Sequence, residues 1–561
     1  MMYFDTYVDV PDVAGKITIK MSKYVMYETG RVYLPDKRYN KPQRVCIGIL
    51  KEDDKSKMKP NDTYKIFFSD IELDEVSEVK RSSCLRIGDH IVIDKIIKEY
   101  QLDELLKAFF KDDYGLLLDL VSYLIVTEDN ASQYYPDYAY NHPLFTKNMA
   151  IFSDSKVSDF LSNVSDDQRI SFLNAWNQIH KSEKIYISYD SSNKNCQALD
   201  IELCEYGHAK DNESKPIINT AVSYDVNNKI PLFYEEYPGS IVDISELDMM
   251  IEKAKGYGYR NIGFILDRGY FSKANIRHID ELNYDFLIAA KGSARFIRKF
   301  IDEVKGSFES DRRKRNNRYQ VYGNTVKMPV FSDNKERYVH IFYNDLKAAF
   351  DRENIEAQLS HMESIMNKGI GTNKDYSSFK KFYNLHYDDN NIFTDYTPRN
   401  SFIEKEKSYC GYFVLISSNI SKADKALGLY KSRDVSEKLF RNDKSYLGNK
   451  AYRVYSASSA KAKSFISFIA LIIRNRIFTY LDEEAQNYPS KPNYMSVPAA
   501  LKELEKIEMI KGSDGIYRLD HAISATQKKI LKAFNMNATT IIDKSNTIKN
   551  RLIKAGNKDN K

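Results

Sequence analysis

Cysteine is scarce in this chain of 561 residues. The five cysteines are scattered and form no CxxC pair: they are Cys46, Cys84, Cys196, Cys204 and Cys410. A disulfide framework needs denser cysteines, and a zinc half-site needs two ligands at close spacing. The sequence therefore predicts neither, and it fits the reducing environment of a cytoplasm.

Long hydrophobic runs are also missing. The longest, Phe465 to Ile473, covers about half of a membrane span and lies between Lys463 and Arg474. We therefore expect a buried helix there and no contact with a membrane. The first ten residues carry Asp5 and Asp9, where a secretory signal would have basic residues and then an apolar run. Nothing in the sequence directs export.

The charge is nearly balanced but unevenly distributed. The 84 Lys and Arg exceed the 78 Asp and Glu by only 6. Residues 521–561 alone carry nine basic and two acidic side chains, a net charge of +7. A second basic cluster comprises Arg312, Arg313, Lys314, Arg315 and Arg318. Such blocks are typical of a solvated surface or of a contact with a polyanion.

The pattern of apolar residues predicts several modules. Alternation indicates a β-rich module, a helical period indicates a second module, and strands that alternate with helices then indicate an α/β domain with a mixed sheet. That last pattern pauses and resumes, which favours a large α+β insertion over two separate domains. The C-terminal pattern predicts a helix over 496–510, a strand over 516–519 and a helix over 524–534, in a winged-helix-like or a purely packing module. The boundaries are 1–90, 91–182, 183–290 with 410–485, 291–409 and 486–561.

Two aspartates follow predicted strands of the α/β domain. Asp190 ends the run from Lys184 to Tyr189, and Asp267 follows the apolar strand Ile262 to Leu266. Open sheets place ligand chemistry at the carboxyl ends of their strands. The alternative for each residue is that it only caps a turn or a helix.

Four functional side chains share one face of a later predicted helix. At about 100° per residue, Tyr430, Arg433, Glu437 and Lys444 lie within roughly 60° of one another. An ordinary surface pair of Arg433 and Glu437 is the simpler alternative. A stripe of phenol, guanidinium, carboxylate and ammonium groups is harder to explain in that way.

Together these residues resemble a known family. Asp190, the turn Asp267-Arg268-Gly269-Tyr270, and Tyr430-x2-Arg433-x3-Glu437-x6-Lys444 are similar to the bacterial insertion-sequence transposases of family four and their close relatives. These are DDE enzymes whose signature is this Tyr-Arg-Glu-Lys spacing. The spacing matches at all four positions, and the resemblance extends from about residue 91 to residue 478.

The resemblance implies a fold and an activity. The fold is a ribonuclease H-like catalytic domain with a large α+β insertion between Asp267 and Glu437, and the helical module before it is a candidate for binding DNA ends. Asp190, Asp267 and Glu437 are the implied metal ligands. Arg433 and Lys444 are implied to contact phosphates near the transposon end, and Tyr430 to assist at the same strand.

The chemistry requires these residue types. Two divalent ions can activate an attacking oxygen and stabilise a leaving one, and they need carboxylate ligands with open positions. We expect two Mg²⁺ ions, with Mn²⁺ able to substitute. The expected partners are the terminal inverted repeats of the protein's own element and target DNA, bound by a homodimer in a bacterial cytoplasm at the nucleoid. The basic cluster at 312–318 is the best candidate for further contacts with the DNA backbone.

Some relatives stack a flipped base on a tryptophan of the insertion. The only tryptophan here, Trp176, lies in the helical module and is expected in the core. Two other functions stay open: a metal-dependent DNA nuclease of the same fold without strand transfer, and a DNA-binding descendant without activity. Three converging acids argue against the last.

Overall fold

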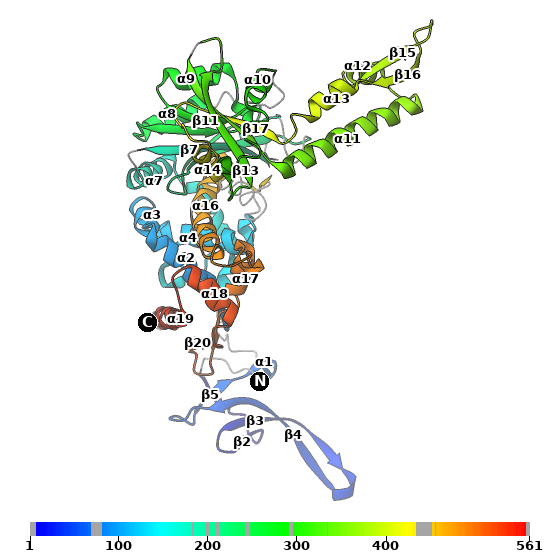
Figure 1. Ribbon diagram of the computed structural model, residues 1–561. Coiled ribbons are helices and arrows are strands. Elements are labelled where there is room, and N and C mark those ends of the chain that lie inside the picture. The colour runs from blue at the N-terminus through cyan, green and yellow to red at the C-terminus, as the bar shows by residue number, and fades with distance from the viewer. Residues whose placement is uncertain are drawn as a thin grey trace. The chain divides into compact units, whose positions relative to one another are not determined.

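The computed structural model describes residues 7–68, 81–181, 184–196, 201–207, 214–241, 247–290, 295–333, 335–433, 451–454 and 456–556 (Figure 1). The chain divides into two compact units, residues 1–80 and 81–561. Each unit is described by itself below.

The first unit is a five-stranded antiparallel sheet. Its order is β1-β5-β4-β3-β2, with β1 Val8–Asp9, β2 Ile17–Lys20, β3 Tyr24–Leu34, β4 Tyr39–Leu50 and β5 Lys57–Pro60. A small core around Val25, Ile47 and Met58 packs under the helix α1 (Asp62–Phe67). The Asn61 side chain caps that helix by accepting hydrogen bonds from two backbone N–H groups. Alternating apolar residues thus produce the predicted strands.

A large mixed sheet forms the centre of the second unit. Its order is β12-β13-β14-β17-β11-β10-β7-β8-β9, and β18 (Ala451–Tyr452) also pairs with β7. The strands nearest the site are β7 Ile185–Cys196, β8 Ile217–Asp225, β9 Ile230–Pro238, β10 Ile262–Leu266, β11 Asp285–Ala289 and β17 Tyr412–Ser417.

The directions of these strands follow their connections. β7, β8 and β9 form an antiparallel meander, and Asp225 accepts hydrogen bonds from the Asn227 and Asn228 N–H groups in the predicted hairpin turn. β10 and β11 run parallel to β7 because the helices α8 (Leu247–Gly256) and α9 (Lys273–Glu281) connect them. The prediction of a mixed α/β sheet is confirmed. Its order is consistent with the ribonuclease H-like sheet that the resemblance implies.

The segment predicted as an insertion has two parts. After α10 (Arg295–Val304), β12 (Arg315–Asn316), β13 (Val321–Pro329) and β14 (Glu336–Tyr343) extend the central sheet, because β14 pairs with β17. The rest forms an arm with its own small core around Leu359 and Tyr383, and Figure 1 shows it leaving the sheet through α11. The arm consists of α11 Asp345–Lys368, α12 Asn373–Phe379, β15 Tyr383–Tyr387, β16 Phe393–Pro398 and α13 Asn400–Lys407.

Helices surround one long central helix, α16 (Ala457–Ala485). By length and composition α16 is the one helix of the described chain that could cross a membrane, but 83% of its most apolar window is buried inside the structure. It is therefore the buried helix that the sequence predicts. The helices of this module are α2 Gly88–Glu99, α3 Leu102–Phe110, α4 Tyr114–Thr127, α5 Tyr135–Asn141, α6 Asp154–Asn163 and α7 Asp166–Ile179.

Local signals in this module are confirmed. Ser165 and Gln168 form the expected capping box at the start of α7. Trp176 is fully buried, and its indole N–H donates to the Pro231 carbonyl at 3.0 Å. The tryptophan is a core residue, as expected.

The C-terminal elements pack against the helical module. They are α17 Val497–Leu504, β19 Glu508–Lys511, β20 Tyr517–Leu519, α18 Ala525–Ala533 and α19 Ala538–Gly556. The helix predicted over 496–510 ends at Leu504, because the following residues pair as β19 with β6 (Cys84–Arg86). The second capping box, Ser524 with Gln527, is present.

Candidate active site

Asp267 stands at the carboxyl end of the buried strand β10. Every residue of β10 is buried, whereas 40% of the Asp267 side chain is exposed. A short 3₁₀ turn, Arg268–Tyr270, follows, and the Asp267 side chain makes no capping hydrogen bond to it. The capping alternative for this residue is therefore wrong. Its carboxylate oxygens remain open toward solvent.

The register of the sheet aligns positions 190 and 267. β10 pairs with β7 from Ile262 opposite Ile185 to Ile265 opposite Ser188. If this register is extended by two residues, Asp267 lies opposite Asp190. Neighbouring strands lie about 4.8 Å apart, so the two backbone positions come close although 77 residues separate them. The side chain of Asp190 lies outside the described structure.

The strand that holds Asp190 is longer than expected. The sequence predicts an end at Tyr189, but β7 continues to Cys196. Its continuation pairs with β8, where Asp190 lies opposite Val222. Asp190 is therefore inside a strand rather than at its end. β10 ends at Leu266, one residue before the position opposite Asp190, so β10 does not continue beside Asp190.

Arg433 connects α14 (Ala423–Ser432) to Asp267. It caps the C-terminal end of α14, and one guanidinium nitrogen, Nη1, lies 3.5 Å from Oδ2 of Asp267. The Arg433 side chain is 6% exposed, and its guanidinium lies 5.4 Å from the centre of the Tyr430 ring. The structure thus brings Tyr430, Arg433 and Asp267 together. Arg433 is a nearly buried cation with one face toward an exposed carboxylate.

Glu437 and Lys444 lie outside the described residues, which end at Arg433 and resume at Ala451. The chain resumes as β18, where Ala451 pairs with Asn195 of β7. The Tyr452 hydroxyl then donates to Glu236 at 2.5 Å, and Ser464 of α16 donates to the same carboxylate at 2.6 Å. Both ends of the segment that holds Glu437 are therefore anchored to this sheet, one beside Asp267 and one on β7.

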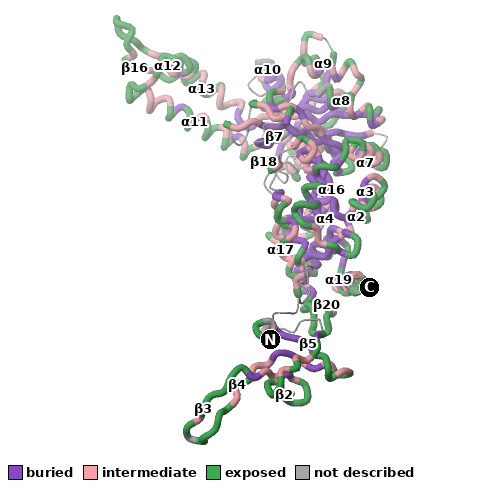
Figure 2. The backbone as a smooth tube through the Cα atoms, turned by 180° about the vertical axis from the view of Figure 1, so that it is seen from behind, coloured by how far each residue is buried: buried purple, intermediate pink, exposed green. Residues whose placement is uncertain are grey.

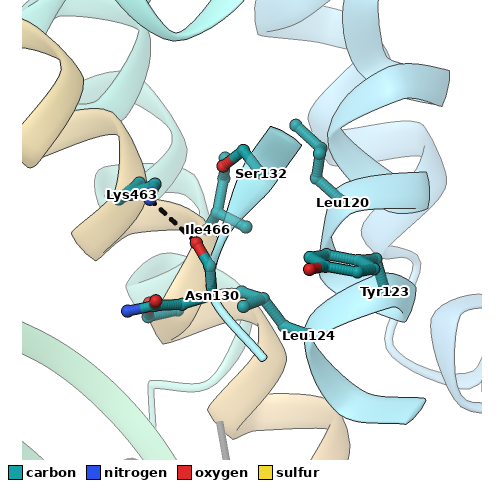
Figure 3. A pocket seen from close by; sticks show the side chains of 8 residues that line it. Leu120, Tyr123, Leu124, Asn130, Ser132, Lys463 and Ile466 are labelled. Carbon is teal, nitrogen blue, oxygen red and sulfur yellow. Dashed lines mark hydrogen bonds between the residues drawn. The ribbon is translucent and has the colours of Figure 1, made fainter. Parts of the chain in front are cut away.

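A lysine secures the second anchor. Lys463 on α16 donates to the Arg453 carbonyl at 3.2 Å and to the Asn130 carbonyl at 2.8 Å, as Figure 3 shows for Asn130. Burial lowers the pKa of Lys463 to about 8. The cavity beside it, which Leu120 and Tyr123 also line, measures about 20 Å³. It has room for about one water molecule and cannot hold a nucleotide.

The basic cluster lies at the other end of α14. Its five cations are all exposed; they lie on a 3₁₀ turn, at the start of β12 at the edge of the sheet, and in the turn after β12. Asn316, within the cluster, donates to Asp424 in the first turn of α14 at 3.0 Å. Nine residues of helix separate Asp424 from Arg433, a length of about 14 Å. Three of these exposed cations have local partners: Arg313 pairs with Asp311, Lys314 donates to Asn324, and Arg315 donates to the Tyr322 hydroxyl.

The described residues contain no group of three or more His, Cys, Asp or Glu side chains that could hold a metal ion. Of the three predicted ligands, only the side chain of Asp267 is described. Its donor chemistry fits a divalent cation, because a carboxylate that is exposed and free of capping bonds leaves oxygen ligands open.

Sequence reasoning missed two features of this site. It did not pair Arg433 with Asp267, and it did not identify Tyr452 as an anchor. No local signal could have found the first, since 166 residues separate the two partners. For Tyr452 the only sign is an aromatic residue shortly before the apolar helix.

Comparison with known proteins identifies a domain. Residues 198–473 match the family model of the transposase DDE domain. The matched range includes Asp267 and the whole segment from Tyr430 to Lys444, and it begins eight residues after Asp190. A search of curated proteins gives no match.

Among solved structures, the chain is similar to a piggyBac transposase in a cryo-EM structure of its synaptic complex with hairpin DNA. The identity is 9% and the TM-score is 0.35, with 82% of each chain covered. A TM-score this low does not establish a shared fold, so the fold described above stands on the chain's own topology.

Proposed function

From the match of residues 198–473 to the transposase DDE domain, we propose that the chain is a DDE transposase that cuts DNA at the ends of its own insertion sequence. The freed ends are then joined to target DNA in the same site. The observation that carries the proposal is the alignment of positions 190 and 267 on neighbouring strands, with Arg433 at 3.5 Å from Asp267.

The third carboxylate can reach this point. Glu437 follows Arg433 by four residues, and four residues of extended chain span at most about 14 Å. The chain length therefore allows Glu437 to reach the pair formed by Arg433 and Asp267. This reach supports Asp190, Asp267 and Glu437 as one set of ligands for two Mg²⁺ ions.

Each residue of the site would have a distinct role. When bound, a pair of divalent cations supplies activation of the attacking oxygen and stabilisation of the leaving oxygen. Arg433 holds the scissile phosphate, since a guanidinium fork grips two phosphate oxygens. Tyr430 supports the guanidinium from its ring face, and Lys444 adds a mobile positive charge.

Two reactions at one site follow from this arrangement. Water attacks the phosphodiester at the end of the element and frees a 3′-hydroxyl. That hydroxyl then attacks a phosphodiester of the target, so one strand is joined as another bond breaks. No covalent intermediate with the protein is needed.

The proposed path of the DNA runs along α14. The exposed basic cluster and Arg433 lie at opposite ends of this helix, about 14 Å apart. That distance corresponds to roughly eight phosphates counted over both strands of a duplex. We propose that a homodimer binds two terminal inverted repeats in this way, in the bacterial cytoplasm.

The test uses purified protein, Mg²⁺ and duplexes from the DNA that flanks its gene. We expect Asp190→Ala, Asp267→Ala and Glu437→Ala to bind these ends but not to cut them. The control is Glu281→Ala, which removes an exposed acid from α9 and should cut normally. Undiminished cutting by one of the three variants would remove that residue from the site.

Product analysis separates the other functions. Cutting without joined products would indicate a nuclease of the same class. Binding without cutting by the wild type, with or without metal, would indicate a DNA-binding descendant.

A further inference from the structure

The outer half of the β3–β4 hairpin projects from the core of the first unit. We call residues 29–44 the ribbon tip. Between Thr29 and Arg44 the described side chains are exposed, except for Leu34 and Pro42, which are half-buried. Figure 2 shows the far ends of β3 and β4 as exposed, while the inner parts of the strands are buried. The ribbon tip has no hydrophobic core of its own.

Burial does not explain why the ribbon is so long. β2 pairs with β3 only from Tyr24 to Tyr27, and β5 pairs with β4 only from Gly48 to Leu50. Glu28 still donates to the Lys16 carbonyl and Ile47 accepts from Asn61, but the five outer pairs, from Gly30 opposite Gln43 to Leu34 opposite Tyr39, bond only to each other. A two-stranded ribbon gains little stability in water. Ten residues of unsupported ladder therefore suggest contact with something outside the unit.

The charges of the ribbon tip identify the kind of partner. Residues 28–44 hold five basic and two acidic side chains, a net charge of +3. Glu28 at the base pairs with Arg31 at 2.7 Å and with Arg44 at 3.3 Å. Lys37, Arg38 and Lys41 have no ion-pair partner among the side chains that the structure describes. Among the described side chains, these three positive charges at the far end thus face no acidic group.

Side chains of mixed type project from both faces of the ribbon. In the register of β3 and β4, Val32 lies opposite Lys41 and Leu34 opposite Tyr39 on one face. Arg31 lies opposite Pro42 and Tyr33 opposite Asn40 on the other. The rings of Tyr33 and Tyr39 are both exposed, at 57% and 47%. Cations, amides and exposed rings on a narrow ribbon are typical of contact with nucleic acid.

We propose that the ribbon tip is a DNA-binding arm that enters the major groove of a duplex. That groove is about 12 Å wide and admits a two-stranded ribbon. Lys37, Arg38 and Lys41 bind phosphates, while Asn40, which projects from the face opposite to Lys41, is placed to reach base edges. The source of the DNA, whether an element end or a target, rests on the proposed function; the binding itself does not.

Salt-dependent binding tests the arm. The full chain is titrated in EDTA, which prevents cutting, against a random-sequence duplex of about 40 base pairs at several salt concentrations. Each lost phosphate contact lowers the salt slope by about 0.9. The variant Lys37→Ala/Arg38→Ala/Lys41→Ala should lose about 2.7 units of slope and bind on the order of 100-fold more weakly at 0.1 M salt.

The controls separate local contact from general charge. Lys20→Ala/Lys23→Ala/Lys55→Ala removes the same charge from exposed sites of the same unit and should keep the wild-type slope. Lys37→Arg/Lys41→Arg keeps the charge of the arm and should bind normally. Far-UV circular dichroism of all variants should match the wild type, because the changed side chains contact no core.

Two results would contradict the proposal that the ribbon tip binds DNA. One is a wild-type salt slope in Lys37→Ala/Arg38→Ala/Lys41→Ala. The other is an equal loss of slope in the control Lys20→Ala/Lys23→Ala/Lys55→Ala. If the triple variant binds DNA normally but no longer self-associates in sedimentation, the ribbon joins two copies of the chain instead. A failure of the proposed function would look different, because Asp267→Ala would then cut DNA while the arm's salt slope stayed unchanged.

Discussion

Replacing Arg433 by lysine is the most discriminating single change at the site. The substitution keeps the positive charge beside Asp267 but removes the planar fork and its stacking on Tyr430. A phosphate held by two parallel hydrogen bonds would then be held by a point charge. We expect Arg433→Lys to fold and bind DNA, but to cut it far more slowly.

The magnitude follows from the geometry. At 3.5 Å and an effective dielectric constant of about 20, the Arg433–Asp267 attraction is about 5 kcal/mol before desolvation. Desolvation of the nearly buried guanidinium offsets most of this gain. Since lysine keeps the charge, the loss in the free energy of unfolding should be about 1–2 kcal/mol. Loss of the bidentate grip in the transition state should cost about 2.7 kcal/mol, a ~100-fold fall in kcat.

These two effects can be separated. Domains have about 5–15 kcal/mol of stability, so a loss of 2 kcal/mol still leaves about 99% of the molecules folded. A ~100-fold fall in rate therefore cannot come from unfolding. The assay is single-turnover cutting of an end duplex at saturating protein, with urea unfolding measured in parallel.

The matched control is Arg337→Lys. Arg337 lies on β14, and its side chain is 1% exposed. It forms ion pairs with Asp280 at 2.7 Å and with Asp333 at 2.9 Å. It should lose at least as much stability as Arg433→Lys but cut at the wild-type rate. Normal cutting by Arg433→Lys, or an equal loss of cutting in Arg337→Lys, would refute the reasoning.

Two further predictions concern DNA affinity and pH. Replacing Arg312, Arg313 and Arg318 by alanine should lower the salt slope of DNA binding by up to about 2.7 without changing kcat at saturating DNA; a lower kcat would move the cluster into the catalytic step. Burial raises the pKa of Asp89 to about 7, above its unfolded value of about 3.8, so its contribution to stability is full at low pH and is lost as the pH rises through 7. Asp89→Asn should therefore gain stability over the wild type between pH 5 and pH 8, by at most about 4 kcal/mol in urea unfolding. Nε2 of His142 lies 3.5 Å from Oδ2 of Asp89, and burial lowers the pKa of His142 to about 4, so the two proteins are compared above pH 5, where His142 is neutral in the folded state; a difference independent of pH would contradict the assignment.

Local patterns predicted the elements of the fold well. The alternating and apolar runs correspond to β8, β9, β10 and β11, and both capping boxes start helices where expected. Pairing between distant segments was not predictable. The strand β14 has a clear strand pattern, but its partner β17 lies about 75 residues later, and nothing local specifies that register. The helix predicted through residue 510 ends early because residues Glu508 to Ile510 form a strand that pairs with β6. The strand β6 lies more than 400 residues earlier in the chain.

The site was predictable where chemistry follows a strand. Asp267 follows a buried apolar run of five residues. A strand this short has one clear carboxyl end, and Asp267 is the first polar residue there. Asp190 was located with the wrong boundary, because the polar residues after it look like a loop. They form a strand since β8 pairs with them along their full length, from Ser191 to Asn195.

The distribution of charge bears on how the protein would hold DNA under the proposed function. Residues 28–44 carry +3, the basic cluster carries +5 and residues 521–561 carry +7, whereas the whole chain carries only +6. The remaining chain therefore has a net charge of −9 and repels a polyanion. Under the proposed function, affinity comes from these segments together with the phosphate contacts of Arg433 and Lys444, so removing one segment should change the salt slope by its own number of phosphate contacts. A protein that bound DNA through diffuse positive charge would instead lose affinity in proportion to net charge, wherever the cations were removed.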